Sequence, residues 1–341
     1  MASFPDLKKG PADFPNPISA LRRQGNINRQ SETRVAAPNG SSENHLPVEL
    51  QQIEVNLDVP NGTLWAFMRP DGRPCQNTGM LSDFKQLQDS MEKIHAENII
   101  DVNYFVFGSR FPKVFSLGGD LHLFASKIRE KDEAALIAYG NSCVEVLHRN
   151  MNALNMPLIT IGLVQGDALG GGFEGLLSFD LIIAEKGTKF GFPEILFGLF
   201  PGMGAYSFLA RRLGPIKAQE LILGGKTYTA EEMHELGIVH ILAEPGRGEA
   251  AVRSYISGNR RRRNGQQGIY QAAREVDRIS LEELQRIVII WAATAMKLTD
   301  RDISVMERLI SAQDRLSLKA KRLKHEYDKV SELAALVRNS M

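Results

Sequence analysis

The sequence predicts an α/β fold with a largely parallel sheet and a helical C-terminal region. Two observations support this prediction. Short apolar runs with strand character alternate with stretches of helical period between about residues 50 and 255. Beyond about Tyr255 the chain becomes nearly all helical by period. We therefore expect a flexible tail over residues 1–46, a catalytic domain over 47–255 and a helical region over 256–341.

The tail is predicted because residues 1–46 are rich in Pro, Asn, Ser and Arg and lack apolar periodicity.

The first elements of the catalytic domain are predicted to form a β-hairpin. Alternation begins near Ile53 and recurs over 63–68, and Pro60-Asn61-Gly62 lies between the two runs. The predicted hairpin is followed by a helix over 81–98.

The next segments alternate between strand and helix. Asp120 is a plausible helix N-cap. The expected elements are a buried strand over 104–108, a strand from Val114, a long helix over 131–154, a strand over 158–164, a loop over 165–172, a short helix over 172–178 and a strand over 181–184.

Composition excludes several classes of protein. Lys and Arg total 41 against 40 Asp and Glu, so the charge balance predicts binding to neither nucleic acid nor an anionic membrane surface. The two cysteines are too few for a disulfide framework. The sequence shows no secretory signal and no apolar run long enough to cross a bilayer. We expect a cytoplasmic protein.

Two glycine turns point to an anion-stabilising site. Gly170, Gly171 and Gly172 open a short helix, whose first N–H groups lack partners within the helix. Gly118 and Gly119 lie between a strand and a helix in the same way. N–H donors of this kind stabilise the negative charge that develops on a thioester carbonyl oxygen during reaction.

Two glutamates follow glycine-rich or aromatic segments. Glu174 lies in the helix behind the three glycines, and Glu194 follows Pro193. Paired carboxylates suit proton transfer at the α and β carbons of an acyl chain, provided that they face one cavity. Nearby phenylalanines would raise the carboxyl pKa. A lone glutamate is more often structural, and Glu194 after Pro193 would also suit an ordinary helix N-terminus.

Three motifs in this order resemble the crotonase (enoyl-CoA hydratase) superfamily. They are FSLGGDL, GGGFE and FPEI, within a match over roughly residues 50–250. The resemblance implies a spiral of ββα units, oxyanion N–H groups on Gly119 and Gly171, and Glu174 and Glu194 as the acid/base pair. Gly118, Gly170 and Gly172 would contact the substrate. No metal or other cofactor is implied.

A narrower resemblance covers the segments 64–80, 281–298 and 300–314, which are similar to the diffusible-signal-factor synthases. It implies dehydration of a 3-hydroxyacyl thioester on acyl carrier protein, or on CoA, and then hydrolysis to a free cis-2-enoic acid. It also implies a homotrimer or dimer of trimers, with a sensor kinase domain as a further partner.

Other interpretations stay open. An ordinary enoyl-CoA hydratase or isomerase is the nearest, and an inactive scaffold that binds a signalling partner is another. Gly170, Gly172 and Gly175 also satisfy a dinucleotide-binding pattern, although a lone match is weak. The arginine run 260–263 is typical of a solvated surface, or of a site for acyl carrier protein or the CoA phosphates.

Overall fold

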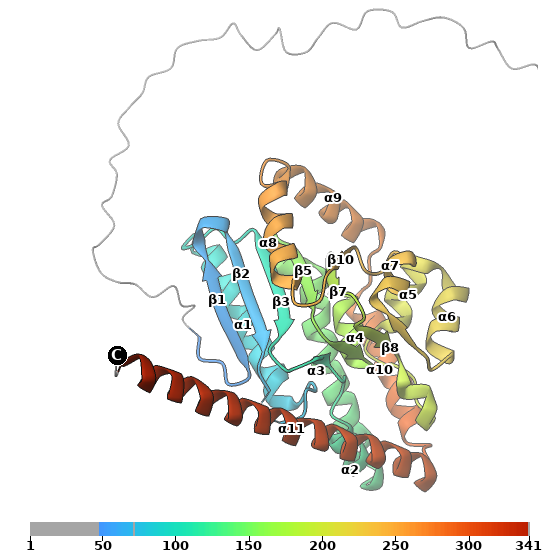
Figure 1. Ribbon diagram of the computed structural model, residues 1–341. Helices are drawn as coiled ribbons and strands as arrows, with labels where there is room; N and C mark the ends of the chain where they lie inside the picture. The colour runs from blue at the N-terminus through green and yellow to red at the C-terminus, as the bar shows by residue number, and fades with distance from the viewer. Residues whose placement is uncertain (1–47, 71, 340–341) are drawn as a thin grey trace, which may run out of the picture. The chain divides into compact units, whose positions relative to one another are not determined.

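The computed structural model describes residues 48–339 apart from residue 71, with side chains described up to residue 322. The predicted tail therefore lies outside the described residues. The main sheet has six strands in the order β1-β2-β3-β5-β7-β10 (Figure 1), and its neighbours are parallel except for β1 and β2. Its strands are β1 (Ile53–Asp58), β2 (Thr63–Met68), β3 (Tyr104–Ser109), β5 (Ile159–Val164), β7 (Leu181–Glu185) and β10 (Ile241–Ala243). The predicted α/β class is confirmed.

The predicted hairpin is confirmed at β1 and β2. A 3-10 turn, η2 (Val59–Asn61), joins the two strands and ends at Gly62, whose φ of 56° is the left-handed conformation that favours glycine. The Gly62 N–H donates to the Val59 carbonyl at 3.0 Å and closes the turn.

Both faces of the main sheet are covered. Alternate residues of β5, such as Ile159 and Ile161, share one apolar cluster with Val252 of helix α8 (Gly248–Asn259). The opposite face packs against a larger cluster that includes residues of α1 (Thr78–Ala96) and α3 (Glu133–Met151). Burial on both faces accounts for the nearly continuous apolar strands of the sequence.

A second, smaller sheet has the order β4-β6-β8-β9. Its strands are β4 (Val114–Ser116), β6 (Asp167–Leu169), β8 (Lys189–Gly191) and β9 (Thr227–Thr229). β4, β6 and β8 are parallel neighbours, whereas β9 runs antiparallel to β8. The prediction that residues 165–172 form only a loop is wrong, because β6 pairs with strands on both sides.

The helices largely follow the sequence pattern. They are α1 (Thr78–Ala96), α2 (Leu121–Arg129), α3 (Glu133–Met151), α4 (Gly171–Leu176), α5 (Ala205–Leu213), α6 (Pro215–Leu223), α7 (Ala230–Glu235), α8 (Gly248–Asn259), α9 (Arg263–Val276), α10 (Leu281–Ala295) and α11 (Asp300–Asn339), with short 3-10 helices η3 (Ala153–Asn155) and η4 (Pro193–Phe197). Asp120 caps α2 by accepting from the His122 and Leu123 N–H groups, which confirms the predicted N-cap.

The C-terminal helices pack directly on the rest of the described chain. α10 lies against α3 so closely that a Cβ atom on Gly140 would lie 2.5 Å from Val288 Cγ1. α11 packs on α2 and η4, and Arg129 of α2 forms an ion pair with Glu307 of α11. The C-terminal helices therefore pack as one unit with the elements that precede them. The domain boundary at residue 256 stays a prediction. No described helix is long and apolar enough to cross a membrane.

Candidate active site

The three sequence motifs converge because each follows the carboxyl end of one strand in the small sheet. β4 leads into Gly118 and Gly119, β6 leads into Gly170, and β8 leads to Glu194. Since β4, β6 and β8 are parallel neighbours, their carboxyl ends meet at one edge. Ligand sites of α/β sheets form at such edges. The small sheet is therefore the frame that positions the predicted residues.

The two glycine turns lie against one another at this edge. A Cβ atom on Gly118 would lie 2.7 Å from the Gly171 nitrogen, and one on Gly171 would lie 3.3 Å from the Gly119 nitrogen. Neither the Gly119 nor the Gly171 N–H donates to an acceptor among the described residues. Two neighbouring N–H groups without partners form the kind of donor pair that an oxyanion requires.

Glycine is required at these turns for steric reasons. The φ angles of Gly118 and Gly170 are 93° and 53°, in the region that other residues rarely adopt. A Cβ atom on Gly172 would lie 2.5 Å from the Ser116 carbonyl oxygen. The start of α4 can therefore approach β4 only without side chains.

Tyr139 of α3 braces the first glycine turn, a role that the sequence did not reveal. Its hydroxyl donates to the Gln76 carbonyl at 2.5 Å and accepts from the Asp120 N–H at 3.2 Å. The Gln76 N–H in turn donates to the Gly118 carbonyl at 2.8 Å. A tyrosine within a helix of ordinary apolar period carries no signal for such a role.

Glu174 lies in α4 and is buried, with 1% of its surface exposed. Its Oε1 atom accepts from the N–H groups of Met203 at 2.8 Å and Ala205 at 3.0 Å. Burial raises the pKa of Glu174 to about 7, although these two hydrogen bonds act in the opposite direction. The side chain is thus fixed in orientation and titrates near neutral pH.

Glu194 begins η4 after Pro193 and faces the second glycine turn. A Cβ atom on Gly170 would lie 2.5 Å from Glu194 Oε1. Oε2 is buried and has no hydrogen-bond partner among the described residues. Burial, and then the negative charge of Glu174, raises the pKa of Glu194 to about 8. This carboxyl group stays protonated at neutral pH with one oxygen free for another molecule.

One cavity joins the predicted groups. Glu174, Glu194, Gly119 and Gly171 all line it. The other three glycines are not among its lining residues, and they shape the turns instead. Its remaining walls are mainly apolar, which is consistent with the raised pKa values.

The C-terminal helices complete this cavity, and sequence reasoning missed that contribution. Trp291 of α10 lines it, as do Leu309, Ala312, Gln313 and Leu316 of α11. Trp291 is 3% exposed, and its ring centroid lies 5.0 Å from that of Phe124. The helical period of α11 predicts a buried face, but not what that face covers.

Several residues near the motifs in sequence, and the arginine run 260–263, do not line the cavity. Phe190 and Phe192 pack on Phe173, with ring centroids 5.2 and 4.8 Å apart, and so belong to the core beneath the site. His122 is exposed. Arg260, from the arginine run, is not at the cavity; it lies beside the β1–β2 turn and donates to the Asn61 side chain at 2.7 Å.

The dinucleotide interpretation does not fit the structure. The helix after the glycines has only six residues, and the strand that precedes it, β6, belongs to the small sheet and not to the main one. A dinucleotide fold instead needs a full crossover helix after a strand of the main parallel sheet.

The fold and the site together define the class of protein. The family model for enoyl-CoA hydratase/isomerase matches residues 72–245, and the chain belongs to this family. The resemblance to the crotonase superfamily is therefore confirmed.

Curated relatives agree with this assignment. The chain is 34% identical over 176 residues to the 2,3-dehydroadipyl-CoA hydratase of Escherichia coli K12, covering 52% of this chain and 63% of the relative. It is 34% identical over 194 residues to the probable mitochondrial enoyl-CoA hydratase 2 of Arabidopsis thaliana, covering 57% of each. The chain thus spans somewhat more than half the length of these relatives.

Solved structures show the same fold. An enoyl-CoA hydratase/isomerase from Xanthobacter autotrophicus Py2 superimposes with a TM-score of 0.62 at 22% identity, covering 80% of this chain and 97% of that one. DspI of Pseudomonas aeruginosa gives a TM-score of 0.54 at 23% identity, covering 67% and 84%. At these identities the likeness concerns the fold alone.

Proposed function

We propose that this chain is a lyase of the enoyl-CoA hydratase type that removes water from a 3-hydroxyacyl thioester. The main support is that two buried carboxyl groups with raised pKa values line the same cavity as two backbone N–H groups without partners among the described residues. The N–H groups would stabilise negative charge on the thioester oxygen, and the carboxyl groups would transfer protons at the adjacent carbons.

The proton balance of the reaction follows from the two pKa values. Between about pH 7 and 8 the pair of Glu174 and Glu194 holds one proton. The ionised carboxylate takes the α proton while the Gly119 and Gly171 N–H groups stabilise the enolate oxygen. The protonated carboxyl then gives its proton to the 3-hydroxyl, the C–O bond breaks and water leaves. The pair again holds one proton.

We further propose that the product is a cis-2-enoic acid signal of the diffusible-signal-factor type. The segments that resemble those synthases include α10 and the first half of α11, which supply Trp291, Leu309 and Ala312 to the cavity wall. These residues lie outside the match to the general family. The resemblance of these wall segments to the synthases is what supports a substrate of the kind that those enzymes use.

Thioester hydrolysis would follow at the same site. Water adds to the carbonyl carbon as a carboxylate takes its proton, the oxyanion sits on the two N–H groups, and the thiol leaves with a proton. The acyl carrier protein, a homotrimer or dimer of trimers, and a sensor kinase domain as partner are proposals on the same resemblance.

An ordinary enoyl-CoA hydratase is the second candidate, because the curated relatives carry hydratase names. Such an enzyme would act on CoA thioesters, form trans products and release no free acid.

Product analysis by mass spectrometry separates the two candidates. The purified chain is incubated with 3-hydroxyacyl carrier protein and with the matching CoA thioester, alongside Glu174→Gln and Glu194→Gln variants. Free cis-2-enoic acid from the wild type, lost in both variants, supports the synthase. A bound trans-enoyl product from CoA alone supports the hydratase, and no product from either substrate would contradict both.

A further inference from the structure

Gln313 is a polar side chain on the face of α11 that closes the active-site cavity. That face consists of Leu309, Ala312, Gln313 and Leu316, whose spacing of three or four residues places them on one side of the helix. Gln313 is 7% exposed, and its amide makes no hydrogen bond with another described residue. A buried amide without partners is costly, so it marks a place where a bound molecule can supply them.

α11 is held against the elements that carry the catalytic motifs. Asp314, the neighbour of Gln313, pairs with Arg73 at 3.2 Å, and Arg73 also lies 4.0 Å from Asp120, the residue directly after the first glycine turn. α11 packs in addition on η4, the element that includes Glu194. Gln313 therefore lines the cavity from a helix that contacts both the oxyanion turn and the second carboxyl group.

Few polar side chains line the active-site cavity, which holds about 230 Å³. The carboxyl and amide groups there belong to Glu174, Glu194 and Gln313. Apart from the indole N–H of Trp291, the other lining side chains are apolar. A polar group of a bound substrate must therefore find its partners among these side chains and the backbone N–H groups of the glycine turns.

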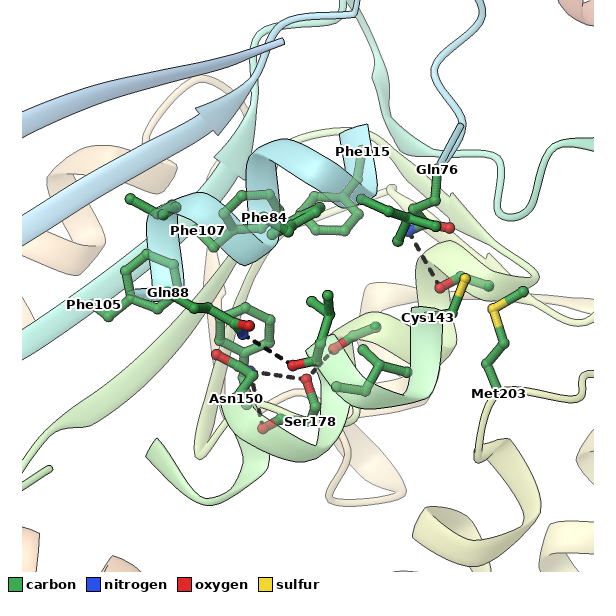
Figure 2. Close-up of a pocket in the computed structure, with 17 residues that line it drawn as sticks. Gln76, Phe84, Gln88, Phe105, Phe107, Phe115, Cys143, Asn150, Ser178 and Met203 are labelled. Carbon is green, nitrogen blue, oxygen red and sulfur yellow. Dashed lines mark hydrogen bonds between the residues drawn. The ribbon is translucent and has the colours of Figure 1, made fainter. Parts of the chain in front are cut away.

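A second cavity beside α4 offers no alternative place for the reacting end of a substrate. It lies between α1, α3 and α4 (Figure 2) and holds about 50 Å³, which is room for about two water molecules. Two of its polar side chains are already occupied. Asn150 Nδ2 donates to the Ser178 hydroxyl at 2.8 Å, and Gln88 Nε2 donates to the Val146 carbonyl at 3.0 Å. The reacting end must therefore lie in the active-site cavity.

The 3-hydroxyl of the proposed substrate needs more partners than the acid/base pair supplies. A hydroxyl group has one donor and two acceptor sites. In the proposed reaction the protonated Glu194 donates to one acceptor site, while the thioester oxygen lies on the two backbone N–H groups. The O–H donor and the second acceptor site then face apolar walls, where an unmade hydrogen bond is costly. The Gln313 amide carries an acceptor oxygen and a donor N–H group and suits either site.

We propose that the Gln313 amide binds the 3-hydroxyl group of the acyl thioester and makes the site select hydroxylated over saturated chains. The inference rests on the proposed function, which requires that hydroxyl group. Residue 313 lies outside the match to the enoyl-CoA hydratase/isomerase family, which covers residues 72–245. The selection therefore comes from α11 and not from the catalytic groups that the family shares.

Four variants separate the amide from its surroundings. Gln313→Met keeps an unbranched side chain of similar length without the amide, and Gln313→Asn keeps the amide on a shorter stem. Ser317→Ala is the matched control, because Ser317 is also a buried polar residue of α11, 8% exposed, and does not line the cavity. Trp291→Phe removes the indole N–H, the other side-chain donor in the cavity.

Calorimetry measures the Kd of racemic 3-hydroxybutyryl-CoA and of butyryl-CoA. Every protein also carries Glu174→Gln, so that the hydroxylated thioester binds without losing its α proton. We expect Gln313→Met to raise the Kd of 3-hydroxybutyryl-CoA about tenfold, the effect of one hydrogen bond in a buried site, and to leave the Kd of butyryl-CoA unchanged. Gln313→Asn should recover part of this loss, and Ser317→Ala should change neither Kd. Gln313→Leu carries the same expectation as Gln313→Met and replaces it if that variant does not fold.

An equal rise in both Kd values would overturn the inference, because it would reflect the shape of the cavity and not the amide. A selective loss in Trp291→Phe but not in Gln313→Met would overturn it as well. Turnover of 3-hydroxybutyryl-CoA by the wild type is measured separately. A selective loss of binding without any turnover would refute only the proposed dehydration, whereas turnover with unchanged binding in Gln313→Met would refute only the role of Gln313.

Discussion

Replacing Glu194 by glutamine should stabilise the protein at alkaline pH while abolishing its proposed activity. Burial and the charge of Glu174 raise the pKa of Glu194 from 4.5 to about 8. At about 1.4 kcal/mol for each tenfold change in an acid constant, this raise corresponds to about 5 kcal/mol. The glutamine side chain has nearly the same shape but cannot ionise.

The direction of this pH effect on stability depends on whether the folded or the unfolded chain binds the Glu194 proton more tightly, and here it is the folded chain. Below about pH 4.5 the carboxyl group is protonated in both the folded and the unfolded chain, and its contribution to stability is fully present. As pH rises towards about 8, the unfolded chain ionises first, so the wild type progressively loses that contribution. The Glu194→Gln variant loses nothing, and we expect its advantage in unfolding free energy to grow by about 2–5 kcal/mol between pH 5 and 9.

Denaturant unfolding of both proteins at pH 5 and at pH 9 measures this growth. The amide adds its own buried polar cost, but that cost is the same at both pH values and cancels in the comparison. Glu235→Gln, at an exposed position of α7, controls for the loss of a negative charge. If the difference between Glu194→Gln and the wild type were equal at pH 5 and pH 9, Glu194 would ionise as an ordinary surface carboxyl does.

Three further predictions concern the same site. The pH profile of kcat/KM should be bell-shaped with a maximum between about 7 and 8, because Glu174 is protonated below this range and Glu194 ionised above it; a flat profile from pH 6 to 9 would contradict it. Gly172→Ala should lower stability by about 1–3 kcal/mol in denaturant unfolding, because its Cβ atom would lie 2.5 Å from the Ser116 carbonyl. Asp120→Ala should cost about 1 kcal/mol through loss of the α2 cap, and an unchanged midpoint would argue against the cap.

The sequence was most informative where local chemistry is distinctive. Gly118 and Gly170 adopt positive φ, which glycine accommodates, so their turns were visible before the strands around them were known. The predicted pairing of Glu174 and Glu194 depended on the order of the motifs, and the structure places both on one cavity. Their catalytic roles stay predictions until activity is measured.

The parts that sequence could not predict depend on contacts between distant segments. β6 has only three residues, too few to show a period of two, and pairing with β4 and β8 is what makes it a strand. The brace from Tyr139 to Gln76 joins residues 63 positions apart. Such contacts follow from the three-dimensional packing of α3, about which local periodicity carries no information.

α4 explains why the active site needs so many glycines. The helix lies between the active-site cavity and a second cavity that residues of α1 and α3 also line. Gly171 lines both cavities, Glu174 lines the first and Gly175 lines the second. A side chain on Gly172 would collide with β4, and one on Gly170 would collide with Glu194. A six-residue helix of this kind contributes little stability of its own. Its geometry is instead fixed by the buried clusters around it, which lets the small sheet hold two carboxyl groups in an apolar environment.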